Sequence, residues 1–243
     1  MNDYYYDLHI HSCLSPCADD DMTPNNIAGM AALKGLNIVA LTDHNSCKNC
    51  PAFFTAAKKY GIIPIAGMEL TTAEDIHLVC LFEYLENAMS FDEEIYGHLM
   101  AVENRSDIFG NQLILDSDDE MIGEEKTLLI SATDLWINEA IEIVKKHGGH
   151  VHPAHIDRES NGIIAILGDI PTEYNFSFVE FNDKNNIENY CNKYQNIKDK
   201  KIIVSSDAHH LWDINEKENF VSLKDEPYSS SLVRKKLFDF LGI

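Results

Sequence analysis

Short apolar or β-branched runs that alternate with helical patterns are the feature that most constrains how this chain folds. Seven runs are predicted strands: Tyr4–Ile10, Asn37–Thr42, Ile62–Ala66, Ile76–Phe82, His150–His152, Phe178–Phe181 and Lys201–Ser205. Strands that alternate with helices and short turns are typical of parallel sheets with right-handed crossovers. The pattern therefore predicts an α/β fold, either a doubly wound sheet or a barrel, and seven strands favour the barrel.

Helix start and stop signals fall between these strands. Thr23-Pro24 is predicted to cap a helix that reaches about Lys34 and stops at Gly35. Other helices are expected from Pro51 to before Gly61, from Thr133 or Asp134 to Lys145, and over Asn185–Ile197 and Ser230–Leu241. A helix is also expected over Asn87–Asn104, and a hairpin from Gln112–Leu115 and Thr127–Ile130.

Length and charge narrow the class of protein. A chain of 243 residues with 45% apolar positions is large enough for one core, so one domain is expected over residues 1–243. The formal charge of -21 argues against an extended nucleic-acid surface, which needs clustered Lys and Arg. No apolar run is long enough to span a membrane and no signal-peptide pattern is present, so a cytoplasmic location is expected.

The acidity is concentrated in one segment. Glu83–Glu125 contains thirteen Asp or Glu residues, and Arg105 is its only basic residue. We therefore expect residues 83–132 to be an acidic insertion in the barrel. Whether it acts as a lid over the barrel mouth or as a solvated surface feature stays open.

Histidine and carboxylate side chains gather at the predicted strand ends. His9 and His11 end the first strand, and because strand residues alternate, both imidazoles face the same side. Further candidates lie at or near later strand ends: Asp43, His44, Glu69, His77, His152, Asp207 and His209. A parallel barrel brings such ends to one face. Mixed imidazole and carboxylate ligands suit Zn²⁺, Mn²⁺ or Fe²⁺, and this number of them predicts two or three divalent ions.

These residues stand in motifs that resemble the PHP (polymerase and histidinol phosphatase) superfamily of metal-dependent phosphoesterases. The matching pieces are Asp7-Leu8-His9-Ile10-His11-Ser12, Met22-Thr23-Pro24, Leu41-Thr42-Asp43-His44-Asn45, Gly67-Met68-Glu69, His77, His152-Pro153 and Ser206-Asp207-Ala208-His209. The resemblance implies a distorted seven-stranded (β/α)7 TIM-like barrel with a metal site at the carboxyl ends of its strands. It also implies hydrolysis of a phosphate ester.

The resemblance further implies three ligand groups. One ion would be held by His9, His11, Glu69 and Asp207. Glu69 would bridge to a second ion held by His77 and His152, and a third would take His44, His209 and an aspartate. That aspartate is uncertain, because the usual Ser-Asp-Gly is replaced by Ser15-Pro16-Cys17-Ala18-Asp19-Asp20-Asp21. Counting back from Thr23-Pro24 favours Asp19, with Asp20 next.

The expected chemistry follows from the ligand set. Metals acidify a bound water to hydroxide near neutral pH and neutralise charge on the phosphoryl oxygens, so no side-chain nucleophile is required. Glu69 would hold the ions together, and His209 or His44, if not fully committed to metal, would protonate the leaving group. Arg158 would clamp the substrate phosphate or be an ordinary surface arginine. Asp43 would orient an imidazole or cap the following loop.

Four cysteines form two closely spaced pairs beyond His11 and His44: Cys13, Cys17, Cys47 and Cys50. If their loops emerge side by side, the thiols would bind an additional metal or cluster or form a disulfide. Incidental thiols are the alternative.

The sequence therefore predicts a metal-dependent phosphoesterase that acts on a small anionic phosphomonoester or a nucleotide-type phosphate. Two other classes stay open. An amidohydrolase or deaminase also begins with His-x-His, although such barrels usually bridge their metals with a modified lysine. A non-catalytic metal-binding or redox-sensing module would account for the four cysteines.

Overall fold

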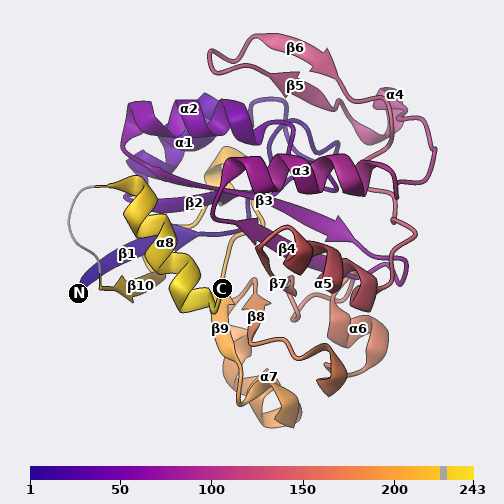
Figure 1. The fold of residues 1–243 in the computed structure, drawn as a ribbon, viewed down its shortest axis with the longest axis vertical. Coiled ribbons are helices and arrows are strands. Elements are labelled where there is room, and N and C mark those ends of the chain that lie inside the picture. Colours follow the sequence, from indigo (N-terminus) through magenta and orange to yellow (C-terminus); the bar gives the residue numbers. More distant parts are fainter. Residues whose placement is uncertain (225–228) are drawn as a thin grey trace.

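The structure, a computed structural model, describes residues 1–224 and 229–243 and centres on a curled six-stranded sheet. The strands lie in the order β10 (Phe220–Leu223), β1 (Asn2–Asp7), β2 (Ile38–Leu41), β3 (Ile63–Thr71), β4 (His77–Phe82) and β7 (Gly149–Pro153). The pairs β1–β2 and β2–β3 are parallel, whereas β4 runs antiparallel to both neighbours and β10 is antiparallel to β1. Figure 1 shows the sheet bending around the centre of the molecule.

Two smaller sheets accompany the main one. A parallel pair is formed by β8 (Phe178–Phe181) and β9 (Lys201–Val204), and a hairpin by β5 (Leu113–Leu115) and β6 (Met121–Glu124). Beyond β9, a single parallel bridge joins Ala208 to Ile10 beyond β1. On the other side, the Ile156 N–H donates to the Glu180 carbonyl over 2.8 Å. The small sheet thus adjoins the chain beyond β7, at one edge of the curled sheet, and the chain beyond β1, the strand next to the other edge.

All seven predicted strands form, and the α/β class is confirmed. The observed pairing departs from the expected distorted seven-stranded barrel in two ways. The ladder divides into six strands and a separate pair, and β4 reverses direction because the turn between Thr71 and His77 is too short for a crossover. The alternation of residue types could not distinguish this hairpin from a parallel connection.

Helices cover the sheet and follow the predicted caps in part. They are α1 (Pro24–Leu33), α2 (Cys50–Tyr60), α3 (Leu85–Tyr96), α4 (Ser106–Phe109), α5 (Ile137–Lys146), α6 (Ile163–Leu167), α7 (Ile187–Lys193) and α8 (Ser230–Leu241). Short 3₁₀ turns span Thr172–Tyr174, Lys184–Asn186, Gln195–Ile197 and Leu211–Asp213. The Thr23 side chain accepts the Asn26 N–H at the start of α1, and α2 ends at Gly61 with φ of 72°.

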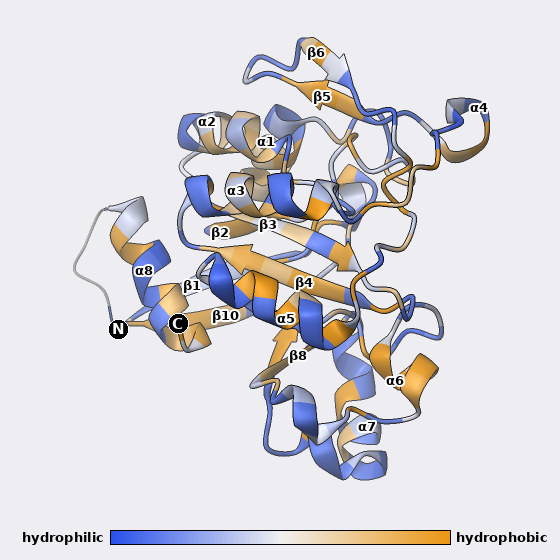
Figure 2. Ribbon diagram, turned by 45° about the vertical axis from the view of Figure 1, so that its right-hand side comes forward, coloured by the Kyte–Doolittle hydropathy of each residue, from blue (hydrophilic) through white to orange (hydrophobic). Residues whose placement is uncertain are grey.

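The two faces of the curled sheet pack against different elements. One face carries Val39, Ala66 and Cys80 and packs with buried residues of α1, α2, α3 and α5. The opposite face carries Ile38 and Ile65, which share a cluster with residues of α8 and of the small β8–β9 sheet. Figure 2 shows hydrophobic colour along β4 and polar colour on the outer turns of α5. This alternation along each strand fixes which side chains face the curled interior.

Several element boundaries differ from the predictions. The helix expected over Asn87–Asn104 ends at Tyr96, and the one over Asn185–Ile197 breaks into α7 flanked by two 3₁₀ turns. The partner of β5 is β6, so Thr127–Ile130 is not the second hairpin strand. The helix expected from Thr133 or Asp134 begins at Ile137. No helix among the described residues is both long and apolar enough to cross a membrane.

The acidic segment is partly scaffold. Its helix α3 packs on β3 and β4 and buries Ala88, Phe91 and Ile95. The chain from residue 97 onward then returns to the loops after β1 and β2. There the Leu113 N–H donates to the Cys13 carbonyl over 2.9 Å, and Gly110 (φ 102°) lies so close to the Pro16 carbonyl that a Cβ would clash. The segment is anchored rather than loosely attached.

Candidate metal centre

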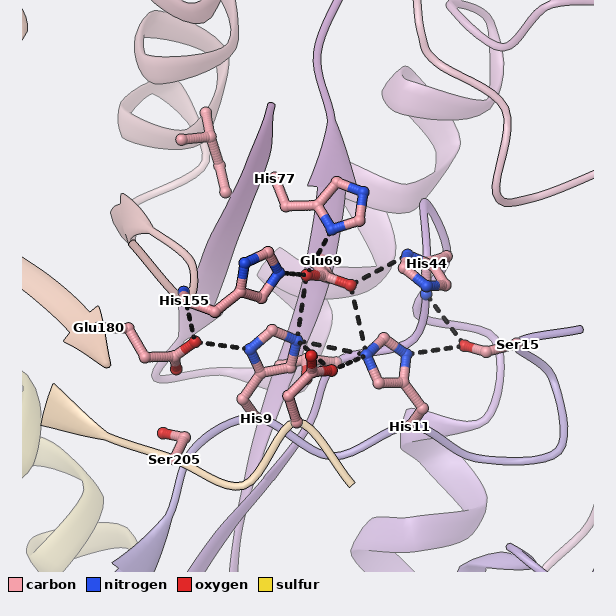
Figure 3. Close-up of polar contacts among 12 residues, drawn as sticks. His9, His11, Ser15, His44, Glu69, His77, His155, Glu180 and Ser205 are labelled. Atoms are coloured by element: carbon pink, nitrogen blue, oxygen red, sulfur yellow. Dashed lines mark hydrogen bonds and ion pairs between the residues drawn. The ribbon is translucent and has the colours of Figure 1, made fainter. Parts of the chain in front are cut away.

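Glu69 lies at the centre of a histidine cluster in the curled interior. It lies on β3 on the same face as Ile65, and its side chain is 1% exposed. One oxygen, Oε1, lies 2.8 Å from His77 Nδ1, 3.0 Å from His155 Nε2 and 3.3 Å from His9 Nε2. The other, Oε2, lies 3.0 Å from His44 Nδ1 and 3.3 Å from His11 Nε2. Figure 3 shows the two sets of imidazoles on either side of this carboxylate.

Three groups of possible ligand atoms share members within this cluster. They are His9 with His11, Glu69 and Asp207; His44 with Glu69 and His77; and His11 with His44 and His209. In each group the ligand atoms all lie within 4.8 Å of one another. Glu69 belongs to two of these groups, so one carboxylate is shared between them.

Hydrogen bonds fix how His9 and His11 face the cluster. His9 Nδ1 donates to Glu180 Oε1 over 2.8 Å, and His11 Nδ1 donates to the Ser15 hydroxyl over 3.0 Å. The Ser15 hydroxyl in turn donates to Asp43 Oδ1 over 2.7 Å. Because each Nδ1 donates away from the cluster, Nε2 is the nitrogen that faces it and would bind a metal ion once its own proton is displaced, and the two Nε2 atoms are 3.2 Å apart. Asp43 thus orients His11 through a hydroxyl.

Without metal, the electrostatics of the cluster favour protonated histidines next to ionised carboxylates. Burial by itself would lower the pKa of His9, but Glu180, Glu69 and Asp207 outweigh burial and raise that pKa well above its usual range. Burial and neighbouring carboxylates act in the same opposed way on His11, whose pKa rises to about 9. Burial would raise the pKa of Glu69, yet the surrounding histidines hold it well below the ordinary value.

His155 reaches the cluster, whereas the predicted ligand His152 does not. His152 pairs across the sheet with Val79, and Val79 pairs with Glu69. His152 is therefore two strands from Glu69, about 10 Å away with a valine between them. Its Nε2 instead lies 3.8 Å from Glu180 Oε2. His155 belongs to the loop beyond β7 and turns back over the strand end with φ of 26°.

Asp19 also lies outside the three groups. Its Oδ1 accepts the Asp21 N–H, and its Oδ2 lies 3.6 Å from His210 Nδ1. The neighbouring candidate Asp20 accepts from Asn111 Nδ2 over 2.8 Å. The exposed Cys17 thiol of the same loop lies near His44 and contributes to the raised pKa of that histidine. His209 joins the third group, with Nδ1 donating to the Asp207 carbonyl over 2.8 Å, so its Nε2 is free to face His11.

Arg158 forms an ion pair with Asp207 and remains 42% exposed. Asp207 lies beyond β9 with φ of 53°, a left-handed conformation that costs energy for a residue other than glycine. Its buried carboxylate has a pKa held far below the usual range, since His9 and His11 outweigh the effect of burial. Arg158 therefore places a cation at the open side of the cluster.

The four cysteines do not assemble into a site. All are free thiols, and no cysteine belongs to a ligand group in the part of the chain that the structure describes. Cys13, Cys47 and Cys50 are buried, and the Cys47 thiol donates to the Gly67 carbonyl over 3.2 Å. Cys17 is exposed and lies toward His44. Cys47 and Cys50 belong to the helix-side core and Cys13 is buried outside that cluster, so the structure favours incidental thiols over a shared site among the described residues.

Two contributors to the cluster were not predicted. Glu180 is the single charged residue in the otherwise apolar strand Phe178–Phe181, and a lone carboxylate in a buried strand could have singled it out. His155 carried no comparable signal, because its role depends on how the loop after β7 turns.

The donor set fits divalent metal ions. The cluster offers imidazole nitrogens and carboxylate oxygens in one buried place, the combination that suits Zn²⁺, Mn²⁺ or Fe²⁺. His44 Nδ1, Glu69 Oε2 and His155 Nδ1 are buried without a well-aligned hydrogen-bond partner among the described residues. Buried polar atoms of this kind need a partner, and a cation facing the first two would provide one.

The fold and the cluster define an α/β protein with a histidine–carboxylate centre at strand ends. The family model described as PHP domain matches residues 7–203, and the chain belongs to this family.

Known proteins give a consistent picture of the fold. The chain is 37% identical over 79 residues to a 5'-3' exoribonuclease of Haemophilus influenzae, which covers 31% of this chain and 28% of that protein. Endonuclease Q from Pyrococcus furiosus superposes with a TM-score of 0.65 at 18% identity, covering 96% of this chain and 55% of the other. A putative metal-dependent phosphoesterase from Bifidobacterium adolescentis gives 0.57 at 17% identity, covering 98% and 96%. The chain thus spans less than a third of the exoribonuclease and about half of the endonuclease.

Proposed function

We propose that this protein is a metal-dependent phosphoesterase that hydrolyses a small phosphomonoester or a nucleotide-type phosphate. The observation that carries the proposal is the position of Glu69, with its two oxygens facing two different sets of imidazoles. A carboxylate in this position is suited to bridge two ions. The amidohydrolase alternative usually relies on a modified lysine for that purpose, so the carboxylate favours the phosphoesterase.

We assign His9, His11, Glu69 and Asp207 to one ion. Glu69 and His77 are assigned to a second ion together with His155, which lies outside the three groups but contacts Glu69 Oε1, and His44 and His209 to a third. Ions bound there would activate water as the nucleophile and offset charge on the phosphoryl oxygens. His155 replaces His152 in this assignment because it is the histidine in contact with Glu69. Asp19 is left out because its carboxylate is directed to His210 and to its own loop.

The chain's own residues would bind and orient the substrate. The Arg158 guanidinium lies half exposed at the cluster and is suited to bind a phosphate through its planar fork of donors. Burial holds the pKa of His209 at about 3, so its imidazole is neutral at pH 7 and offers a lone pair rather than a proton. Without metal the pKa of His44 is raised to about 9, and an ion bound there would displace that proton, so we assign His44 the role of a ligand rather than of a proton donor.

The substrate class includes nucleic-acid phosphates. A second endonuclease Q structure, with a 27-mer duplex bearing an abasic lesion at its active site, superposes with a TM-score of 0.64. The net charge of the chain is therefore not sufficient to exclude a nucleic-acid substrate, and that expectation from the sequence is corrected. The acidic segment anchored beside the β1 and β2 loops would still repel a long polyanion, which favours a short or single-nucleotide substrate.

Phosphate release tests the proposal directly. Protein loaded in turn with Mn²⁺, Zn²⁺ or Fe²⁺ is offered sugar phosphates, nucleoside monophosphates, short oligonucleotides and an abasic duplex. We expect metal-dependent turnover of at least one small ester, abolished by a chelator and restored by metal. Full metal loading with no phosphate or phosphodiester cleavage across this panel would contradict the proposal and favour the non-catalytic module.

A further inference from the structure

We propose that Glu180 is a positioning residue that holds His9 and His155 in place for metal binding. The inference rests on the proposed metal centre but concerns a residue outside its ligand groups. Glu180 lies on β8, in the small sheet, and its side chain is 1% exposed. Its oxygen Oε1 meets two candidate ligands that come from two other elements (Figure 3).

The contact with His9 selects which ring nitrogen faces the cluster. His9 Nδ1 lies 2.8 Å from Glu180 Oε1, so the proton of the neutral ring is held on Nδ1. The lone pair of Nε2 is then directed toward Glu69 Oε1 at 3.3 Å and Asp207 Oδ1 at 3.4 Å. A carboxylate behind a ligand histidine in this way fixes the ring and increases its basicity.

The contact with His155 supports a strained turn. The same Oε1 accepts the His155 backbone N–H over 3.2 Å, and the next N–H, that of Ile156, donates to the Glu180 carbonyl over 2.8 Å. His155 has a φ of 26°, which costs energy and persists only where surrounding bonds enforce it. These two bonds turn the chain so that His155 Nε2 comes within 3.0 Å of Glu69 Oε1.

His152 lies on the other side of the same carboxylate. Its Nε2 is 3.8 Å from Glu180 Oε2, and neither atom has a direct hydrogen-bond partner among the described residues. His152 is fully buried. His152 of the His-Pro motif thus lies next to Glu180 Oε2, while Glu180 Oε1 accepts hydrogen bonds from His9 and from the His155 backbone. One buried carboxylate connects β1, β7 and β8 where the two sheets adjoin.

The test compares Glu180→Ala and Glu180→Gln with the control Glu188→Gln, which alters an exposed glutamate on α7. Affinities for Zn²⁺ and Mn²⁺ are measured by competition with a chromophoric chelator, without substrate. We expect Glu180→Ala to weaken binding about 10–100-fold. Glu180→Gln keeps an acceptor for the His9 proton but loses the charge, so its affinity should fall between that of Glu180→Ala and wild type.

A purely structural role is distinguished by a second measurement. Nitrogen NMR of the zinc-loaded protein reports which nitrogen of His9 keeps its proton, and we expect that proton on Nδ1 in wild type and Glu180→Gln but redistributed in Glu180→Ala. Wild-type metal affinity in the folded variants would overturn the proposal, even if their unfolding temperature falls. If Glu180→Ala does not fold, wild-type affinity of Glu180→Gln alone overturns it. Because no substrate is used, the result is independent of whether the protein is a phosphoesterase.

Discussion

Side chains on the strands and side chains on the loops reach the cluster by different routes. Glu69 on β3 and His77 at the start of β4 face the interior because strand residues alternate and the β3–β4 register places Thr71 opposite His77. His155 and Asp207 lie beyond strand ends and reach the cluster through left-handed backbone held by hydrogen bonds. Strand positions are therefore set by pairing, and loop positions by specific local contacts.

The largest effect on metal binding and activity is expected from a change at Glu69, a strand residue. Glu69→Gln removes a charge shared by two ligand groups, so we expect the loss of at least one bound ion and a fall in kcat/KM of about 10²–10³-fold or more. Elemental analysis and phosphate-release kinetics measure the two effects. Glu120→Gln, at an exposed position, is the matched control. Normal metal content in Glu69→Gln would show that the Glu69 carboxylate does not bridge two ions.

The pH dependence of stability and of metal affinity tests whether His11 and His44 are protonated in the metal-free protein. In the metal-free protein the pKa of His11 and of His44 is raised to about 9, against about 6.5 in an unfolded chain. Their protonated forms stabilise the metal-free fold, fully below about pH 6.5, and this contribution is lost as the pH rises through about 9. Ions must displace these protons, so apparent affinity should rise about tenfold per pH unit for each proton displaced.

Thermal unfolding with and without metal from pH 6 to 10 measures this dependence. The metal-free protein should lose stability across the window, and the stabilisation by metal should grow. A metal affinity that stays constant over the window would show that these histidines do not bind the ions.

The comparison is sharpened by the two histidines near β7. His155→Asn should weaken the binding of one ion about 10–100-fold, because His155 Nε2 contacts Glu69. His152→Asn should have a smaller effect on affinity, since His152 contacts the cluster only through Glu180. Chelator competition on both variants gives the order. The reverse order would show that His152 on β7, and not His155 in the following loop, is the ligand.

Much of the fold could be predicted from the sequence, but the site could be predicted only where strands define it. Alternating apolar runs located all seven strands, and the Thr23-Pro24 and Gly61 signals located helix ends. They did not show that β4 is antiparallel, because the predicted strand ended at Ala66, whereas β3 continues to Thr71 and leaves a turn too short for a crossover. His152 was favoured over His155 for the same reason: only the register shows that Val79 separates His152 from Glu69.

Arg158 tests how a loop cation contributes. Arg158→Gln removes a guanidinium that pairs with Asp207 and, in the proposed function, a substrate phosphate. We expect KM to rise about 10–150-fold with a smaller change in kcat, since loss of a charged hydrogen bond costs about 1.5–3 kcal/mol. Steady-state kinetics separate the two constants, and Arg158→Lys should recover part of the loss. A fall in kcat alone would mean that Arg158 acts through Asp207 rather than on the substrate.

The smallest effect is expected at the buried cysteines. Cys47 and Cys50 lie in the core on the helix side, and burial raises the pKa of the Cys47 thiol well above its usual range, so it should be unreactive. The double variant Cys47→Ser/Cys50→Ser should keep wild-type metal content and lose about 1–3 kcal/mol of stability for each substitution, the cost of burying a hydroxyl in place of a thiol. Cys17, which is exposed beside His44, should react first with a thiol reagent in the native protein. Loss of metal in the double variant, with Cys17→Ser unaffected, would place a cysteine-bound ion in the core and separate it from the histidine cluster.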